Sequence, residues 1–157
     1  MQKYAPKEKF VERMKLLLHD EDDVKQFFSV AEKVSRKAIR VNTLKISAAE
    51  LKKRFEEKTW AIRQPFKNHP EIMIIESELV PGELGRSIEH LLGYYYIQEI
   101  TSMMPILALR PSLGFLLDLC ASPGSKTTQA AVLMQNCGTI IANDVSIGRI
   151  SILIANL

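Results

Sequence analysis

Hydrophobic positions follow two different periods along this chain. Near the start, apolar residues recur every three or four positions, at Phe10, Val11, Met14, Leu17 and Leu18, and more loosely at Val24, Phe27, Phe28 and Val30. This spacing is typical of amphipathic helices. We therefore expect two short helices, separated by the acidic stretch from Asp20 to Asp23.

After these helices the pattern changes to strands and helices in alternation. Residues 38–43 alternate apolar with polar side chains, as a half-buried strand does. Ser47 and Glu50 have the spacing of a capping box, which predicts a helix from Ala48 to about Glu57. The further elements expected before residue 100 are strands at 71–76 and 94–98, a Pro81-Gly82 turn and a short helix at 84–92 that Gly93 ends.

The segment from Phe115 to Asp144 is the most informative part of the chain. An apolar, strand-like run at 115–119 breaks at a turn of small residues, 120–127, and a helical pattern follows. A second apolar run, 139–142, leads into Asn143-Asp144, which places a carboxylate 20 residues after Gly124. That is about where a doubly wound fold places its ribose-binding acid.

These elements predict an α/β protein in two parts. Residues 1–100 are expected to form a small N-terminal α/β module together with the two initial helices. Residues 101–157 are expected to form the beginning of a Rossmann-like doubly wound domain, entered through a helix at 101–109 and ending in a helix at 146–157. Because such a sheet usually has about five or six strands and only two are predicted here, we expect the chain to be the front part of a longer protein.

Composition narrows the class of protein. The chain has 157 residues, of which 46% are hydrophobic and 25% charged, which is typical of a globular protein. Its apolar runs are too short to cross a bilayer and its start does not resemble a secretory signal, so we expect no membrane association. A cytoplasmic location follows, or a nuclear or nucleolar one in a eukaryote. Two cysteines and three histidines lack metal-ligand spacing, so no metal is expected.

Positive charge is concentrated in one segment. Residues 31–67 contain 11 Lys or Arg and 4 Asp or Glu, a net charge of 11 − 4 = +7. A polyanion-binding surface needs such a concentration, although a solvated helix face explains part of it. From this segment we predict RNA contacts at Arg36, Lys37, Arg40 and Lys45.

The turn at 120–127 favours an anion. Pro123 fixes the turn, Gly124 allows close approach of a ligand, and the amides of residues 125–127 open a helix whose N-terminus attracts negative charge. The turn lacks the glycines of a dinucleotide motif and the Gly-Lys pair of a phosphate loop. A methionine-derived cofactor fits better, with its carboxylate at the helix start, Asp144 on its ribose and Arg149 beside the ribose or adenine.

Several of these residues have a second interpretation. Asp144 could be an ordinary turn or helix-capping residue, since Asp is common at such positions. Lys126 could contact the cofactor carboxylate or lie in solvent. Asp118 could contact the amine of the ligand or tie down the turn, and small size explains Cys120 better than nucleophilic chemistry does.

The run from Asp118 to Gln129 closely resembles the cofactor-binding motif of the Sun and nucleolar-protein family of RNA cytosine-5 methyltransferases. Residues 40–44, residues 96–103 and the Ala142-Asn143-Asp144 segment with Arg149 also look like family motifs. The resemblance implies a Rossmann-like fold, S-adenosylmethionine as cofactor and a preceding small domain that holds RNA. It implies cofactor contacts at Cys120, Ala121, Ser122, Pro123, Gly124, Ser125, Lys126, Asp144 and Arg149.

The resemblance also implies a reaction, methyl transfer to C5 of a cytosine in tRNA or rRNA. Ser122 and Ser125 stand where many members have Ala and Gly, which slightly favours tRNA. Family enzymes attack cytosine with a cysteine that follows Pro or Thr, and this sequence contains neither pair. We therefore expect no catalytic residue in this chain and no activity from it alone. The alternative is a non-catalytic RNA-binding module whose nucleotide-like turn is structural.

Overall fold

The structure is a computed structural model that describes residues 6–18, 20–31 and 36–157. The chain divides into two compact units, residues 1–35 and 36–157. In the first, α1 (Glu8–Leu17) and α2 (Glu21–Ala31) confirm the two helices expected from the apolar spacing. The rings of Phe10, Phe27 and Phe28 contact one another, with centroids 5.3 to 6.4 Å apart, and join the two helices.

The second unit begins with a four-stranded antiparallel sheet. Its strands are β1 (Ala38–Val41), β2 (Ile62–Arg63), β3 (Ile72–Ile75) and β4 (Tyr95–Ile97), in the order β2-β3-β1-β4. Three of these strands were expected, and the two-residue edge strand β2 was not, because it is too short to show a period. All four residues of β1 are buried, although one of them is Arg40.

One face of this sheet carries the hydrophobic core of residues 36–100, which we call the front module. Helix α3 (Ala48–Glu57) packs Leu51 and Phe55 against the sheet, where both are fully buried together with Met73. Ser47 caps α3 by accepting a hydrogen bond from the amide of Glu50 at 3.1 Å. The return bond expected of a capping box is replaced by a pair between Glu50 and Arg54.

The helix predicted at 84–92 forms as two helices, α4 (Glu83–Arg86) and α5 (Ile88–Leu91). Ser87 separates them because its backbone is extended, with φ −66° and ψ 149°. Its hydroxyl caps α5 by accepting a bond from the amide of His90 at 3.2 Å. The continuous apolar pattern thus concealed a cap in the middle of the segment.

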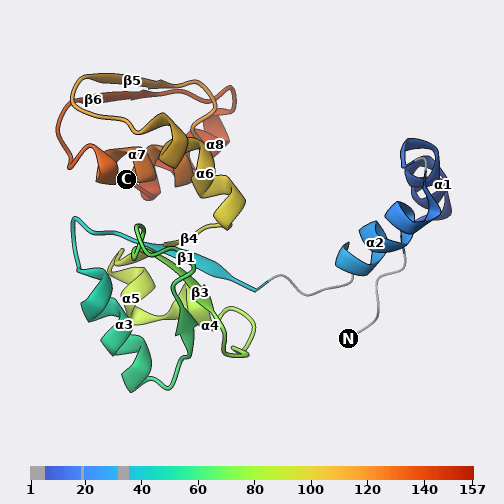
Figure 1. The fold of residues 1–157 in the computed structure, drawn as a ribbon. Coiled ribbons are helices and arrows are strands. Elements are labelled where there is room, and N and C mark those ends of the chain that lie inside the picture. The colour runs from blue at the N-terminus through green and yellow to red at the C-terminus, as the bar shows by residue number, and fades with distance from the viewer. Residues whose placement is uncertain (1–5, 19, 32–35) are drawn as a thin grey trace. The chain divides into compact units, whose positions relative to one another are not determined.

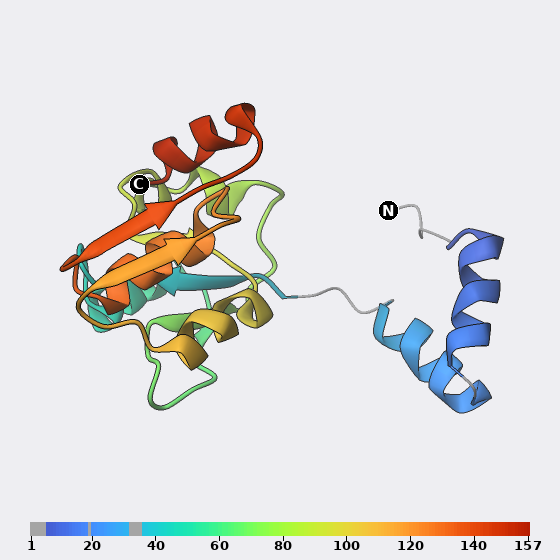
Figure 2. The same ribbon diagram turned by 90° about the horizontal axis from the view of Figure 1, so that it is seen from above.

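Behind the other face of the sheet lies the helical layer that carries the candidate site. Met103 of α6 (Ile100–Leu109) is fully buried against Ala38, Ile72 and Ile74. Beyond α6, β5 (Phe115–Asp118), α7 (Ser125–Leu133) and β6 (Thr139–Ala142) form a parallel β-α-β unit, and α8 (Ile147–Ala155) follows. In Figure 1, α6 and α7 lie between the two sheets, and in Figure 2, seen from above, α7 lies behind β5.

The two-stranded parallel sheet is apolar on a face that nothing in the described chain covers. Phe115 is 86% exposed, Leu117 60% and Ile141 55%. Strands of parallel sheets are usually buried on both faces, which explains why their sequence is apolar throughout. No helix in the part of the chain that the structure describes combines the length and apolar character needed to span a membrane.

Tyr95 connects the front core to α4 and α5. Its hydroxyl donates to the carbonyl of Leu84 at 2.6 Å and lies 2.7 Å from the hydroxyl of Ser87. Burial raises the pKa of Tyr95 from 10.0 to about 12. The stabilisation that this shift represents is therefore complete below about pH 10 and is lost as the pH rises toward 12.

Replacing Tyr95 by Phe is expected to lower the free energy of unfolding by about 1 kcal/mol at neutral pH, because the Leu84 carbonyl loses its donor. The difference between the two proteins should shrink by roughly 1 kcal/mol between about pH 9 and pH 11, because only the wild type has this phenol to ionise. Chemical denaturation at both pH values measures the difference. A difference that stays constant with pH would contradict the assignment.

Candidate cofactor-binding site

The turn predicted to hold an anion lies between β5 and α7. Gly124 is the N-cap of α7 and has φ 107°, a left-handed conformation that side-chain-bearing residues rarely adopt. No side chain caps this helix end. The first amides of α7 therefore lack the partner that Ser, Thr or Asp usually supplies, which suits a carboxylate or phosphate.

Asp118, at the end of β5, ties down the turn. One carboxylate oxygen accepts the hydroxyl of Thr127 at 2.7 Å, and the other accepts the amide of Cys120 at 3.3 Å. These bonds tie down the turn, and contact of Asp118 with the amine of a ligand stays a prediction. The bond to Thr127 fixes the first turn of α7 to the strand that precedes it.

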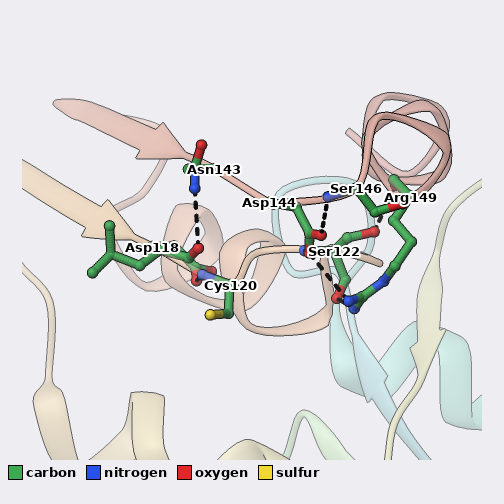
Figure 3. Close-up of polar contacts among 8 residues, drawn as sticks. Asp118, Cys120, Ser122, Asn143, Asp144, Ser146 and Arg149 are labelled. Carbon is green, nitrogen blue, oxygen red and sulfur yellow. Dashed lines mark hydrogen bonds and ion pairs between the residues drawn. The ribbon is translucent and has the colours of Figure 1, made fainter.

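Asp144 joins the turn to the segment after β6, as Figure 3 shows. Its carboxylate accepts the amide of Ser122 at 3.2 Å and the amide of Ser146 at 3.1 Å. Arg149 lies 3.5 Å from the same carboxylate and donates to the Ser122 carbonyl at 2.6 Å. The Ser122 hydroxyl in turn donates to the Arg149 carbonyl at 2.6 Å. We call these contacts among Ser122, Asp144, Ser146 and Arg149 the clasp.

The clasp bears on the proposed ribose contacts. Asp144 is only 6% exposed and both of its carboxylate oxygens already accept bonds from the protein. The structure therefore places Asp144 and Arg149 next to the turn, as expected, and gives both of them structural partners. Their contact with a ribose stays a prediction, and it requires a ligand hydroxyl to share or replace one of these bonds.

The remaining predicted cofactor residues line the same turn. Ala121, Ser122 and Gly124 are buried, whereas Cys120, Pro123 and Lys126 are exposed and Ser125 is half-buried. Lys126 projects from the first turn of α7 and is therefore available to an anion at the helix start. Cys120 is a free thiol.

Arg40 corrects the RNA-contact prediction. It is 4% exposed, and its guanidinium donates to three oxygens of the protein interior, so it is not available to RNA. Positive charge in the sequence could not distinguish a buried arginine from a surface one. Burial lowers the pKa of Arg40 to about 10, which still leaves it charged at neutral pH.

The buried polar side chains around Arg40 were not predicted from the sequence. Arg40 donates to the side-chain oxygen of Gln98 at 3.0 Å. Gln98 donates to Gln129 at 3.2 Å, and Gln129 donates to the carbonyl of Met103 at 3.0 Å. Gln98 and Gln129 are 5% and 2% exposed. The sequence contains only a weak indication that these two side chains are buried, because each is a single glutamine beside an apolar run.

The other three predicted RNA contacts are on the surface. Arg36 forms an ion pair with Glu76, and the Lys45 ammonium donates to the Leu92 carbonyl at 3.2 Å. Lys37 is exposed and makes no ion pair with a described residue. Much of the remaining positive charge is paired with acids: Lys52 with Glu56, Arg54 with Glu50, Lys58 with Glu89 and Arg63 with Glu76.

Within residues 6–18, 20–31 and 36–157, no three His, Cys, Asp or Glu side chains gather closely enough to hold a metal ion.

Two family models cover nearly all of this sequence. Residues 6–100 match the N-terminal domain of 16S rRNA methyltransferase RsmF, and residues 105–157 match 16S rRNA methyltransferase RsmB/F. The chain belongs to the RsmF family. This confirms the family resemblance found in the cofactor motif.

A curated relative of the RsmF family agrees with this assignment. The ribosomal RNA small subunit methyltransferase F of Vibrio cholerae is 42% identical over 154 residues, which cover 96% of this chain and 32% of the relative. The chain thus spans about a third of the length of the relatives it matches.

Solved structures confirm the expected fold. A methyltransferase homologue from Pyrococcus horikoshii superimposes with a TM-score of 0.75 at 31% identity, covering 97% of this chain and 53% of that one. NSun6 from the same organism gives a TM-score of 0.77 at 21% identity, covering 96% and 62%. Both support the α/β architecture with the beginning of a Rossmann-like methyltransferase fold.

Gly124→Ala is expected to destabilise the protein by about 1–3 kcal/mol, because φ 107° strains an L-residue and the new Cβ lies 3.0 Å from the Leu153 side chain. Gly148→Ala is the matched control. Gly148 lies inside α8 with no atom closer than 4.0 Å to its added Cβ, so alanine should leave stability unchanged or raise it by up to about 1 kcal/mol. Thermal and chemical unfolding measure both. Equal effects at the two positions would refute the role given to Gly124.

Proposed function

We propose that this chain is the cofactor-binding and RNA-contacting front part of an S-adenosylmethionine-dependent RNA cytosine-5 methyltransferase. One observation carries the proposal. The uncapped start of α7 at Gly124 lies beside the end of β6 and Asp144, the arrangement in which parallel α/β folds bind nucleotide-like ligands.

The residues present fit the amino-acid end of the cofactor. The first amides of α7 offer donors to its carboxylate, and Lys126 adds a positive charge at the surface. Asp144 is the proposed acceptor for the ribose hydroxyls, and Arg149 lies beside it. S-adenosylmethionine supplies the methyl group. The proposed cofactor contacts are those named from the sequence, Cys120 to Lys126, Asp144 and Arg149.

The chain lacks a candidate for the attack on cytosine. Its two cysteines, Cys120 and Cys137, are not preceded by Pro or Thr. Cys120 lies in the cofactor turn, and we expect it at the amino-acid end of the ligand rather than at its methyl group. We therefore propose that these 157 residues bind and position ligands, and that methyl transfer requires the part of the protein that corresponds to the remaining length of the relatives.

For the substrate we propose rRNA of the small ribosomal subunit rather than tRNA. The names of the RsmF relatives favour it, and the tRNA preference rested on two residues, Ser122 and Ser125. We also propose a cytoplasmic location, since the relatives are bacterial and give no support to a nuclear one. The proposed division into an RNA-contacting module, residues 1–100, and a cofactor domain, residues 101–157, is supported by the ranges of the two family matches.

Calorimetry with S-adenosylmethionine tests the cofactor site. The wild-type chain should bind it, and Asp144→Ala should weaken binding by at least about tenfold, because the ribose loses its acceptor and the clasp loses its centre. Glu57→Ala, which removes an exposed carboxylate at the end of α3, is the control and should bind as the wild type does. Binding that is absent from the folded wild type would favour the alternative of an RNA-binding module with a structural turn.

RNA binding tests the exposed basic residues. The double variant Lys37→Glu and Lys45→Glu should weaken binding to a small-subunit rRNA fragment and reduce the salt dependence of the binding constant by a slope of about 1 to 2, because up to two phosphate contacts are lost. Lys25→Glu, which changes an exposed charge on α2, is the control. Filter binding at several salt concentrations measures both, and equal losses in the two proteins would exclude a specific role for Lys37 and Lys45.

A further inference from the structure

Arg40 is an unusual residue for the centre of a sheet. It lies on β1 with 4% of its surface exposed, and arginines are rarely buried this far unless a carboxylate neutralises them. No acidic side chain of the described chain lies within ion-pair distance of it. Its partners are neutral oxygens, and its Nε atom is buried without a hydrogen-bond partner.

Two of the three partners of Arg40 belong to the first turns of α7. One end of the guanidinium donates to the Ser125 carbonyl at 2.7 Å and the other to the Thr128 hydroxyl at 2.8 Å. The Thr128 hydroxyl can then direct its own hydrogen to the Gly124 carbonyl, which lies 2.8 Å away. Arg40 thus holds the carbonyls of Gly124 and Ser125, one of them through Thr128, from a strand 85 residues earlier in the chain.

The rest of the network fixes Arg40 itself. Gln98 accepts from the guanidinium, and Gln98 is linked through Gln129 to the Met103 carbonyl of α6. The ring of Tyr96 lies under the guanidinium, with its centroid 5.7 Å from the Cζ atom. Because Gln98 and Tyr96 hold the Arg40 guanidinium in place, it cannot move freely with α7. The position of β1 therefore constrains the position of the start of α7.

Burial of Arg40 costs free energy that no ion pair in the described chain offsets, and the Glu71 carboxylate acts on it only from beyond ion-pair distance, so stability alone does not account for this residue. It does add positive potential beside the amides that open α7, where an anion is expected. We propose that Arg40 is a positioning residue, which sets the cofactor turn from the front module through the Ser125 carbonyl and the Thr128 hydroxyl. This inference rests on the proposed function for its ligand, whereas its structural part concerns the turn alone.

Arg40→Met keeps much of the length of the side chain and removes the guanidinium group. S-adenosylmethionine affinity should fall by about tenfold or more, because the turn that meets the amino-acid carboxylate is released and loses a nearby charge. Binding of 5′-methylthioadenosine, which lacks the amino-acid portion, should change less than about twofold. Thr128→Val removes one of the hydrogen bonds of Arg40 with little change of side-chain shape. It should also weaken S-adenosylmethionine more than methylthioadenosine, but by a smaller factor than Arg40→Met does.

Hydrogen exchange separates this inference from the proposed function. In Arg40→Met, the amides of Ser122, Gly124 and Thr128, which donate to the Asp144 carboxylate and to the carbonyls of residues 121 and 124, should exchange at least about tenfold faster, while those of α3 stay protected. The matched control is Arg63→Met, which removes an exposed arginine of β2 that pairs with Glu76. It should leave both the turn and the affinity unchanged.

Two results would overturn the role of Arg40. One is amide exchange at positions 122, 124 and 128 that is the same in Arg40→Met, Thr128→Val and Arg63→Met. The other is equal weakening of S-adenosylmethionine and methylthioadenosine by Arg40→Met. If the wild-type chain binds neither compound, the proposed function fails, and the exchange data still decide whether Arg40 holds the turn.

Discussion

The bond between the Ser122 amide and the Asp144 carboxylate is the contact on which the candidate site depends. It joins the turn after β5 to the segment after β6, and parallel strands bring those two segments to the same edge of the sheet. Asp118 fixes the other side of the turn through Thr127. The turn is therefore anchored at both ends by carboxylates, and the uncapped start of α7 between them is left for a ligand.

The front module contributes to this site through a costly interior contact. Its sheet buries Arg40, and a buried cation without an ion-pair partner is not an arrangement that packing alone favours. The guanidinium reaches α7, and the Gln98 and Gln129 side chains extend the network to α6. The two segments that the family models match separately, residues 6–100 and 105–157, are thus connected by polar contacts, and Met103, which lies between the two matches, packs against β1 and β3.

Periodicity and turn chemistry predicted most of the fold. The strands at β1, β3, β4, β5 and β6 and the helices at both ends follow from apolar spacing, whereas β2 is too short and Ser87 interrupts a helix that the apolar pattern presents as continuous. The sequence predicted where the candidate site lies, but only part of the contacts that its residues make. A sequence does not record whether a charged group is buried, so Arg40 was placed on the RNA surface and the partners of Asp144 and Arg149 could not be foreseen.

A crystal structure of this chain with S-adenosylmethionine would show directly whether the turn between β5 and α7 binds the cofactor. We expect the amino-acid carboxylate to lie against the first amides of α7, with the ribose hydroxyls at Asp144 and the bond from the Ser122 amide to Asp144 retained. A ligand bound elsewhere on the protein, or a turn that remains empty at saturating concentration, would contradict this expectation.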